Sequence, residues 1–293
     1  MIPNFVMHRP GTLDEVLSLL GELGDGARVY AGGTELLLVL REGFLQADHL
    51  VDIKRIPDLA GIHLESTRLV RIGATTVHTD IERSDLIREH LPALAALESG
   101  IANVRVRNTG TLGGNLCFAE PHGDPATLLL AADAQVTIAG SEGIRTAALQ
   151  GWVRGPFEVD LAPGEVLTGI LIPLPAPRSR LAYRRFRALE RPSAAVAVRV
   201  ELAPDGSVAD GRVFAGCVGP SPQRLVNAEA ALRELRAEDV VRAATLVGAA
   251  GADEADVDTD AHGPADHKRQ LIRVLARRAV IDAVKQGRDG LVN

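Results

Sequence analysis

The sequence is poor in several residue types, and each shortage excludes a class of protein. Only two cysteines, Cys117 and Cys217, occur among 293 residues, which supports neither a disulfide framework nor a zinc or iron–sulfur site. Free thiols of this kind are usually small buried hydrophobic residues. Only three of the 32 basic residues are lysines, and none follows a glycine-rich loop, so a P-loop is excluded.

Charge and hydropathy narrow the choice further. A net charge of −6 and a pI near 5.8 argue against a nucleic-acid partner, which requires a basic face. No apolar stretch reaches the length of a membrane-spanning helix, and the first residues lack the pattern of an export signal. The histidines are scattered and no His-Glu-x-x-His occurs. We therefore expect a cytoplasmic protein with no membrane span, no nucleic-acid partner and no metal site.

Two glycine-rich turns are the most informative features that the sequence does contain. The first is Ala31-Gly32-Gly33-Thr34-Glu35, and the second is Gly110-Thr111-Leu112-Gly113-Gly114-Asn115. Paired glycines let backbone N–H groups approach one point, because no Cβ atom stands in the way. A concave row of such groups binds anions, and two rows on one chain predict a dinucleotide held from both sides. Thr34 is predicted to cap the helix that follows the first turn. The alternative for this turn is an ordinary strand-to-helix connection.

An acidic residue, Asp124, follows the second turn and offers a carboxylate for sugar hydroxyls or an adenine amino group. The alternative is that the second turn is a buried hairpin and that Asp124 caps a helix beginning at Pro125. His122 and Asp124 lie close in sequence, but no serine nucleophile motif accompanies them. We therefore leave His122 outside the predicted site.

Hydrophobic periodicity predicts an α+β protein. Prolines between Pro173 and Pro177 predict a linker. Residues 251–265 are acidic and rich in small side chains, and are predicted to form a mobile loop. The predicted helices are 12–23, 34–41, 78–83, 86–90, 92–99, 127–131, 226–235, 237–247 and 267–286, and the predicted strands are 28–31, 49–53, 69–72, 135–139, 166–172, 181–188, 194–202 and 212–218.

The two turns, Asp124 and two later segments resemble the FAD-binding medium subunit of the molybdenum hydroxylases, the family of xanthine dehydrogenase and carbon monoxide dehydrogenase. The later segments are 164–170 and Tyr183-Arg184-Arg185-Phe186-Arg187. The resemblance implies a PCMH-type FAD-binding fold over residues 1–175, with subdomains at about 1–55 and 56–175. A C-terminal domain over 178–288 is implied to combine a three-stranded sheet with a helix bundle.

The resemblance also implies which residues contact FAD. Both turns would bind the diphosphate, Asp124 the ribose and adenine side, and Arg187 the region of the flavin ring. Tyr183 is a possible gate over the ring, with a core aromatic as the alternative. The implied cofactor-binding residues are Val29, Tyr30, Ala31, Gly32, Gly33, Thr34, Glu35, Leu36, Ile101, Gly110, Thr111, Leu112, Gly113, Gly114, Asn115, Asp124, Leu167 and Arg187.

Two positions depart from the family pattern. Residues 188–193 lack an aspartate that is common in relatives, and Ile101 stands where the xanthine enzymes have an aromatic residue. Both departures concern the ring pocket and the electron acceptor rather than the diphosphate. The chain also lacks the cysteine-bearing loop by which some relatives hold a [4Fe–4S] cluster.

By this resemblance the chain is an oxidoreductase subunit that transfers electrons. A small partner subunit would carry two [2Fe–2S] clusters and a large one the molybdopterin, as a dimer of heterotrimers. FAD on this chain would pass electrons to NAD⁺, a quinone or oxygen. The alternatives are a stand-alone FAD oxidase or dehydrogenase of the same fold, and a nucleotide-binding scaffold without redox activity.

Overall fold

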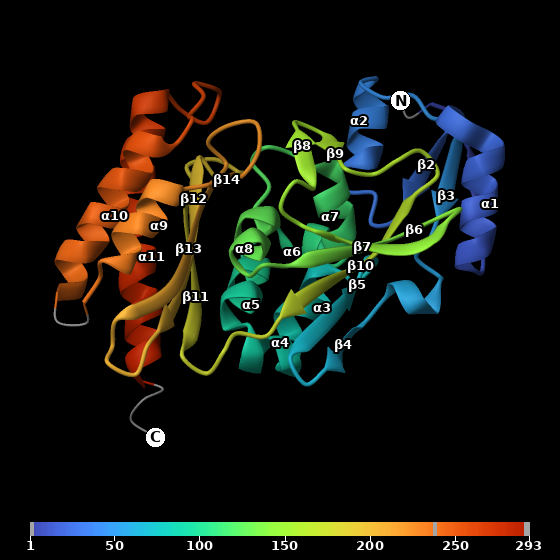
Figure 1. The fold of residues 1–293 in the computed structure, drawn as a ribbon. Coiled ribbons are helices and arrows are strands. Elements are labelled where there is room, and N and C mark those ends of the chain that lie inside the picture. The colour runs from blue at the N-terminus through green and yellow to red at the C-terminus, as the bar shows by residue number, and fades with distance from the viewer. Residues whose placement is uncertain (1–2, 237–238, 290–293) are drawn as a thin grey trace.

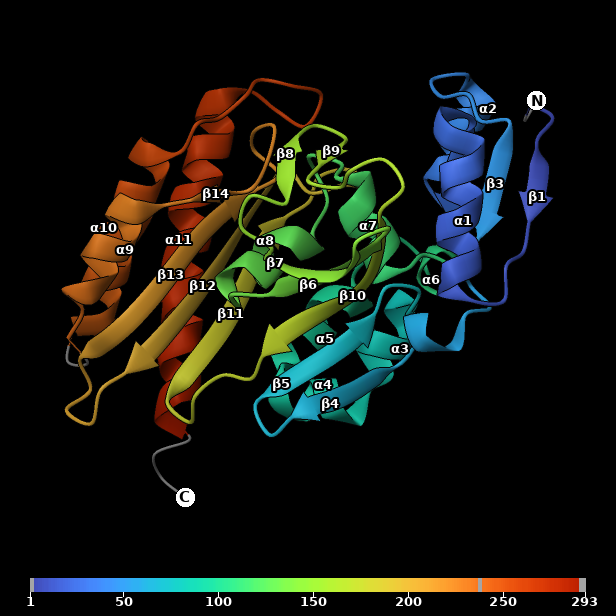
Figure 2. The same ribbon diagram turned by 45° about the vertical axis from the view of Figure 1, so that its right-hand side comes forward.

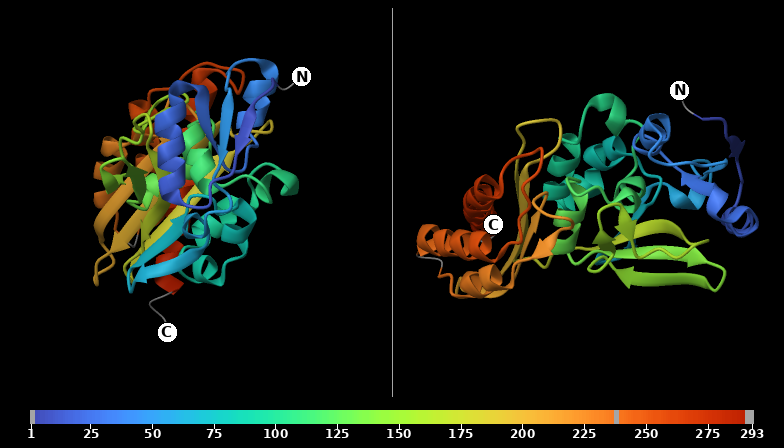
Figure 3. Two further views of the ribbon diagram at one scale, coloured as in Figure 1. Left: turned by 90° about the vertical axis from the view of Figure 1, so that its right-hand side faces the viewer. Right: turned by 90° about the horizontal axis from the view of Figure 1, so that it is seen from above.

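The computed structural model describes residues 3–236 and 239–289. Three units follow one another along the molecule (Figure 1). The N-terminal unit and the C-terminal helices lie at opposite ends, and a unit of intermediate residues lies between them (Figure 3, right). In the described part of the chain, no helix combines the length and apolar character that a membrane crossing requires.

The first unit is a small parallel sheet flanked by two helices. Its strands are β1 (Val6–His8), β2 (Ala27–Tyr30) and β3 (His49–Asp52), in the order β1-β3-β2, and its helices are α1 (Leu13–Leu23) and α2 (Leu36–Glu42). Thr12 caps α1 by accepting a hydrogen bond from the Glu15 amide, as the sequence predicts. Val16 of α1 is fully buried and packs with Val51 of β3.

The second unit is an antiparallel sheet with helices packed against it. Its sheet has the order β4-β5-β10-β6-β7, and a separate pair joins β8 to β9. The strands are β4 (Ile62–Ser66), β5 (Leu69–Gly73), β6 (Gln135–Gly140), β7 (Gly143–Ala148), β8 (Val153–Gly155), β9 (Glu158–Val159) and β10 (Val166–Pro173). The helices are α3 (His78–Arg83), α4 (Asp85–His90), α5 (Pro92–Ser99), α6 (Val104–Arg107), α7 (Leu112–Phe118) and α8 (Pro125–Ala131).

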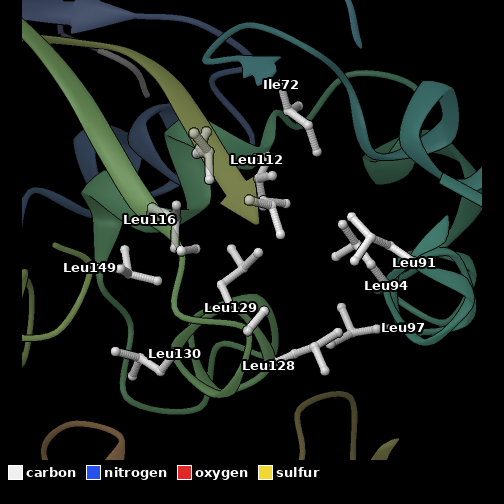
Figure 4. Close-up of a cluster of buried hydrophobic side chains, with 14 of the residues drawn as sticks. Ile72, Leu91, Leu94, Leu97, Leu112, Leu116, Leu128, Leu129, Leu130 and Leu149 are labelled. Carbon is white, nitrogen blue, oxygen red and sulfur yellow. The ribbon is translucent and has the colours of Figure 1, made fainter. Parts of the chain in front are cut away.

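Leucines from three helices form the core of this second unit. Side chains of α5, α7 and α8 converge in Figure 4, where Leu97, Leu116 and Leu129 are among those labelled. Burying one such side chain stabilises the fold by about 1.5–3 kcal/mol. Residues 166–172 of the central strand β10 are all buried. This core fixes α7 and α8, and with them the second glycine turn and Asp124, against the sheet.

The third unit is an antiparallel sheet with helices on its outer face. The strands are β11 (Ser179–Phe186), β12 (Ala194–Leu202), β13 (Val208–Gly216) and the short β14 (Gln223–Arg224), in that order, so the sheet has one strand more than predicted. The helices are α9 (Val226–Arg233), α10 (Val240–Glu254) and α11 (Ala265–Asp289). They cover the face that points away from the second unit (Figure 2; Figure 3, right), whereas α8 packs on the opposite face.

The structure differs from several sequence predictions. The second glycine turn opens into helix α7, so it is not a hairpin. Helix α10 continues to Glu254, because Gly251 and Ala252 are buried and pack in the C-terminal core. Asp260, predicted to lie in a mobile loop, bonds to Lys268. The predicted helix start at 237–238 lies outside the described residues.

Candidate functional site

The first glycine turn connects β2 to α2 and leaves a row of backbone amides without partners. Gly33 has a φ of +72°, and a Cβ atom there would lie 2.3 Å from the Tyr30 ring. Within the described residues, the N–H groups of 32–35 donate to no protein atom. Thr34 does not cap α2, because Glu35 is the N-cap residue and makes no side-chain capping bond. The turn therefore offers four consecutive amides to an external anion.

The second glycine turn lies directly against the first. A Cβ atom on Gly32 would be 2.3 Å from the carbonyl oxygen of Thr109, so the two backbones are in contact. A Cβ atom on Gly110 would be 3.3 Å from Oγ1 of Thr34. The fold thus brings the two predicted turns side by side, although they belong to different units.

Three consecutive amides of the second turn, in contrast, are already used within the chain. Leu112 N–H donates to Thr76 O at 3.1 Å, Gly113 N–H to Ala74 O at 3.1 Å, and Gly114 N–H to Thr111 Oγ1 at 3.0 Å. The expectation of a second free row is therefore wrong for this structure. A Cβ atom on Gly113 would lie 2.5 Å from Ala74 O. Helix α7 packs so closely against residues 74–76 that position 113 has room only for a glycine.

Asp124 binds side chains of the C-terminal unit and does not cap helix α8. It precedes Pro125 and is 8% exposed, but its carboxylate makes no capping bond. Instead Oδ1 accepts a hydrogen bond from the Tyr183 hydroxyl at 2.5 Å, and Oδ2 pairs with Arg185. The capping alternative is therefore wrong. Asp124 joins α8 to strand β11 across the boundary between the second and third units.

Burial, reinforced by the Asp124 carboxylate, raises the pKa of Tyr183 well above its usual value. The phenol therefore stays protonated and donates a hydrogen bond to Asp124. The ring also packs against the large core cluster, as the core-aromatic alternative predicts. The hydrogen bond therefore holds the Tyr183 hydroxyl beside Asp124.

Arg187 directly follows strand β11 and bonds the segment that leads to Ile101. The Arg187 guanidinium donates to Gly100 O at 3.0 Å, and its side chain is exposed. Ile101 follows Gly100 and is 8% exposed. Leu167 lies within strand β10, where it is buried in the core.

The remaining predicted residues lie in β2, α2 and α7. Val29 and Tyr30 end strand β2, and Lys54 lies over the Tyr30 ring at 3.8 Å. Leu36 begins α2 and packs in a small cluster with Leu40. Asn115 lies in α7, and its Oδ1 faces Gly123.

Two residues near the turns, Arg191 and His122, are not part of the predicted site. Arg191, in the segment between β11 and β12, bonds both Glu35 and Glu120. His122 bonds the carbonyl of Pro192. Their partners are distant in sequence and no local pattern marks them, so no sequence signal was available. Among the described residues, no group of three or more potential metal ligands comes together.

Two family models together match nearly the whole chain. Residues 3–175 match the FAD binding domain in molybdopterin dehydrogenase. Residues 179–283 match the CO dehydrogenase flavoprotein C-terminal domain. The boundary between the two matches falls in the proline-rich linker.

Relatives and solved structures agree with these matches. The chain is 32% identical to the carbon monoxide dehydrogenase medium chain of Hydrogenophaga pseudoflava, covering 95% of this chain and 96% of that one. It is also 32% identical to the xanthine dehydrogenase FAD-binding subunit of Escherichia coli O157:H7, over 76% of this chain and 77% of that one. A structure of the Hydrogenophaga pseudoflava carbon monoxide dehydrogenase superposes with a TM-score of 0.92 at 32% identity, over 98% of this chain and 99% of that one.

Proposed function

The chain belongs to the family of FAD-binding medium subunits of the molybdenum hydroxylases, and we propose that it receives electrons from [2Fe–2S] clusters on a partner subunit and delivers them through FAD to NAD⁺, a quinone or oxygen. The family is one of oxidoreductase complexes. When bound, FAD supplies both one-electron and two-electron redox chemistry. The protein's task is to bind the cofactor and to set its electrostatic surroundings.

The free amide row of the first glycine turn is the observation that carries this proposal. Four consecutive N–H groups suit a doubly charged diphosphate, which accepts several hydrogen bonds at once. Gly33 has a φ that side chains disfavour, and Gly32 has no room for a Cβ atom. Both glycines are therefore needed for the turn to keep this shape. The residues present fit the diphosphate of FAD.

The other predicted residues have consistent roles in this proposal. Asp124 is fixed by Tyr183 and Arg185, and its remaining lone pairs are available for cofactor hydroxyls. Arg187 would place positive charge near the flavin ring, where reduction adds negative charge. Ile101 and Leu167 would contribute apolar contacts.

The proposed partners follow from what the chain lacks and from its relatives. Cys117 and Cys217 cannot hold two [2Fe–2S] clusters, so these would reside on a small subunit, with the molybdopterin on a large subunit. We place the chain in a cytoplasmic dimer of heterotrimers. The match of residues 179–283 to a flavoprotein C-terminal domain favours such a subunit over a stand-alone oxidase or an inactive scaffold.

Competition between fragments of FAD tests the cofactor assignment. The full chain freed of flavin is titrated with FAD while ADP or riboflavin is present, and flavin fluorescence is followed. ADP carries the diphosphate and riboflavin does not, so ADP is expected to compete more strongly. Riboflavin competing as well as ADP would place the main binding energy away from the amide row.

Metal analysis and acceptor assays test the electron-transfer assignment. The chain, purified with its natural partners, is expected to contain molybdenum and iron in addition to flavin. After the metal centres have been reduced, rapid mixing with NAD⁺, a quinone or oxygen identifies the acceptor by the rate of flavin reoxidation. A preparation that reduces its flavin with an organic substrate but contains no iron would support the stand-alone oxidase instead.

A further inference from the structure

Arg191 lies between two carboxylates at the first glycine turn. Its Nη2 is 2.9 Å from Glu35 Oε1, and its Nη1 is 2.5 Å from Glu120 Oε2. Glu35 is itself the last residue of the free amide row, and Glu120 follows the end of helix α7. One guanidinium therefore links the C-terminal unit to both loops beside the predicted diphosphate position.

These carboxylates pose an electrostatic problem for a diphosphate. Two negative charges beside the amide row would repel a ligand that carries about two more. Like charges a few ångströms apart repel each other strongly in a partly buried site, where water screens them poorly. With Arg191 in place the three side chains sum to −1, whereas without it they sum to −2.

The charge on Arg191 is secure. Burial of the guanidinium opposes the charged form, but Glu120 and Glu35 outweigh it and raise the pKa of Arg191. The guanidinium therefore stays positively charged at every pH at which the protein is folded.

The segment that carries Arg191 is anchored on its C-terminal side. His122 Nδ1 donates to Pro192 O at 2.8 Å, and the Ser193 amide donates to Phe186 O at 2.8 Å. His122 Nε2 lies 3.0 Å from Asp260 Oδ2, which Lys268 also bonds at 2.5 Å. These contacts hold the backbone next to Arg191 independently of its own ion pairs.

We propose that Arg191 is an additional positioning residue of the cofactor site, which neutralises Glu35 and Glu120 so that a diphosphate can occupy the adjacent amides. This inference rests on the proposed function, because it takes FAD as the ligand. It assigns Arg191 an electrostatic role, distinct from that of a simple clamp between loops. The two roles predict opposite effects for one substitution.

That substitution is Glu120→Gln. It removes one repelling charge and leaves Arg191 paired with Glu35, so the full chain should bind FAD a few times more tightly. A simple clamp predicts the reverse, because an ion pair is lost. Fluorescence titration of the apo chain with FAD measures the difference, and weaker binding by this variant would overturn the proposal.

Arg191 itself provides the second arm of the test. Arg191→Gln should weaken FAD binding about tenfold, equivalent to about 1.4 kcal/mol, and added salt should shrink the loss. The double variant Arg191→Gln/Glu120→Gln should recover most of the affinity, and Arg191→Lys should bind nearly as wild type does. A double variant as weak as Arg191→Gln alone would also overturn the proposal.

Arg199→Gln is the matched control. Arg199 also bridges two carboxylates, Asp133 at 2.6 Å and Asp210 at 3.0 Å, but on the sheet of the C-terminal unit. Its loss should leave FAD affinity unchanged, and circular dichroism confirms that each variant is folded. A wild-type chain that binds no FAD would contradict the proposed function. Normal wild-type binding with unchanged affinity in Arg191→Gln would contradict only this inference.

Discussion

Gly32 and Thr109 are in backbone contact, and this contact joins the first unit of the fold to the second. A Cβ atom on Gly32 would lie 2.3 Å from the Thr109 carbonyl oxygen, closer than any real contact of that kind. The obstacle is main chain, which cannot rotate away as a flexible side chain can. The two turns can therefore lie this close together only because residue 32 has no Cβ atom.

Replacing Gly32 with alanine should push the two turns apart. We expect a loss of about 1–3 kcal/mol in the free energy of unfolding, as in other overpacked sites, together with weaker FAD binding. Urea unfolding and FAD titration measure the two effects. Gly21→Ala is the control, since Gly21 lies exposed in α1 with open space around its Cα, and should stabilise the chain by about 0.5–1 kcal/mol. Equal behaviour of the two variants would contradict the contact.

Removing the Asp124 carboxylate should cost more than removing a helix cap. Asp124→Ala leaves the Tyr183 hydroxyl and the mostly buried Arg185 guanidinium without their partner, which should cost about 2–4 kcal/mol. Thr12→Ala, which removes only the cap of α1, should cost about 1 kcal/mol. The denaturant concentration at which each variant is half unfolded measures its loss of stability. A loss no greater for Asp124→Ala than for Thr12→Ala would show that the pairing with β11 contributes little.

Both thiols should be unreactive in the folded chain and should destabilise it at alkaline pH. Burial raises the pKa of Cys117 to about 12 and also raises that of Cys217. A raised folded pKa means that the unfolded chain loses its thiol protons first, so stability is complete below about pH 9 and falls as pH rises from 9 toward 12. A thiol reagent at pH 8 should label neither residue until denaturant is added.

The variant Cys117→Ala is the control for the pH dependence of the unfolding free energy. Cys117→Ala should reduce the decline in unfolding free energy between pH 9 and 11, although its cavity lowers stability at every pH. Rapid labelling of Cys117 in the native chain at pH 8 would show instead that its thiol is accessible.

A buried hydroxyl on α8 should be dispensable. Thr127 is fully buried, and within the described residues its Oγ1 has no hydrogen-bond partner. Thr127→Val should therefore leave the free energy of unfolding unchanged or raise it by about 1 kcal/mol, because an unsatisfied polar group is removed. Thr75→Val is the contrast, since Thr75 Oγ1 donates to Leu59 O at 2.7 Å and its loss should cost about 1 kcal/mol. Thermal unfolding should show that Thr127→Val is the more stable of the two variants.

The sequence predicts most elements of regular structure because their signals are local. The Thr12 cap, the apolar β10 and the proline linker each depend on neighbours in sequence, and the α+β class is confirmed by the comparisons. Short strands such as β1 and β14 were missed, since two or three residues carry no periodicity. Helix α7 was missed because its glycines disfavour helix, and packing against residues 74–76 overrides that preference.

Only part of the candidate site could be predicted from the sequence. Family membership is confirmed, and the structure brings the two predicted turns together, while the contacts of individual residues with FAD remain predictions. The capping role considered for Asp124 was wrong because the partners of its carboxylate come from β11. Arg191 was missed for the same reason, since Glu35 and Glu120 are distant from it in sequence. Long-range pairing of side chains leaves no trace in a single sequence.

The arginines that pair with Asp124, Glu35 and Glu120 come from the other side of the linker. Arg185 and Arg191 both follow Pro177, whereas Asp124, Glu35 and Glu120 all precede it. A chain truncated at the linker would keep both turns but would present three uncompensated carboxylates to an anionic ligand. The proposed diphosphate site in the first 175 residues thus depends on counter-charges of the C-terminal unit, and a nascent chain would not carry all of them until synthesis had passed residue 191.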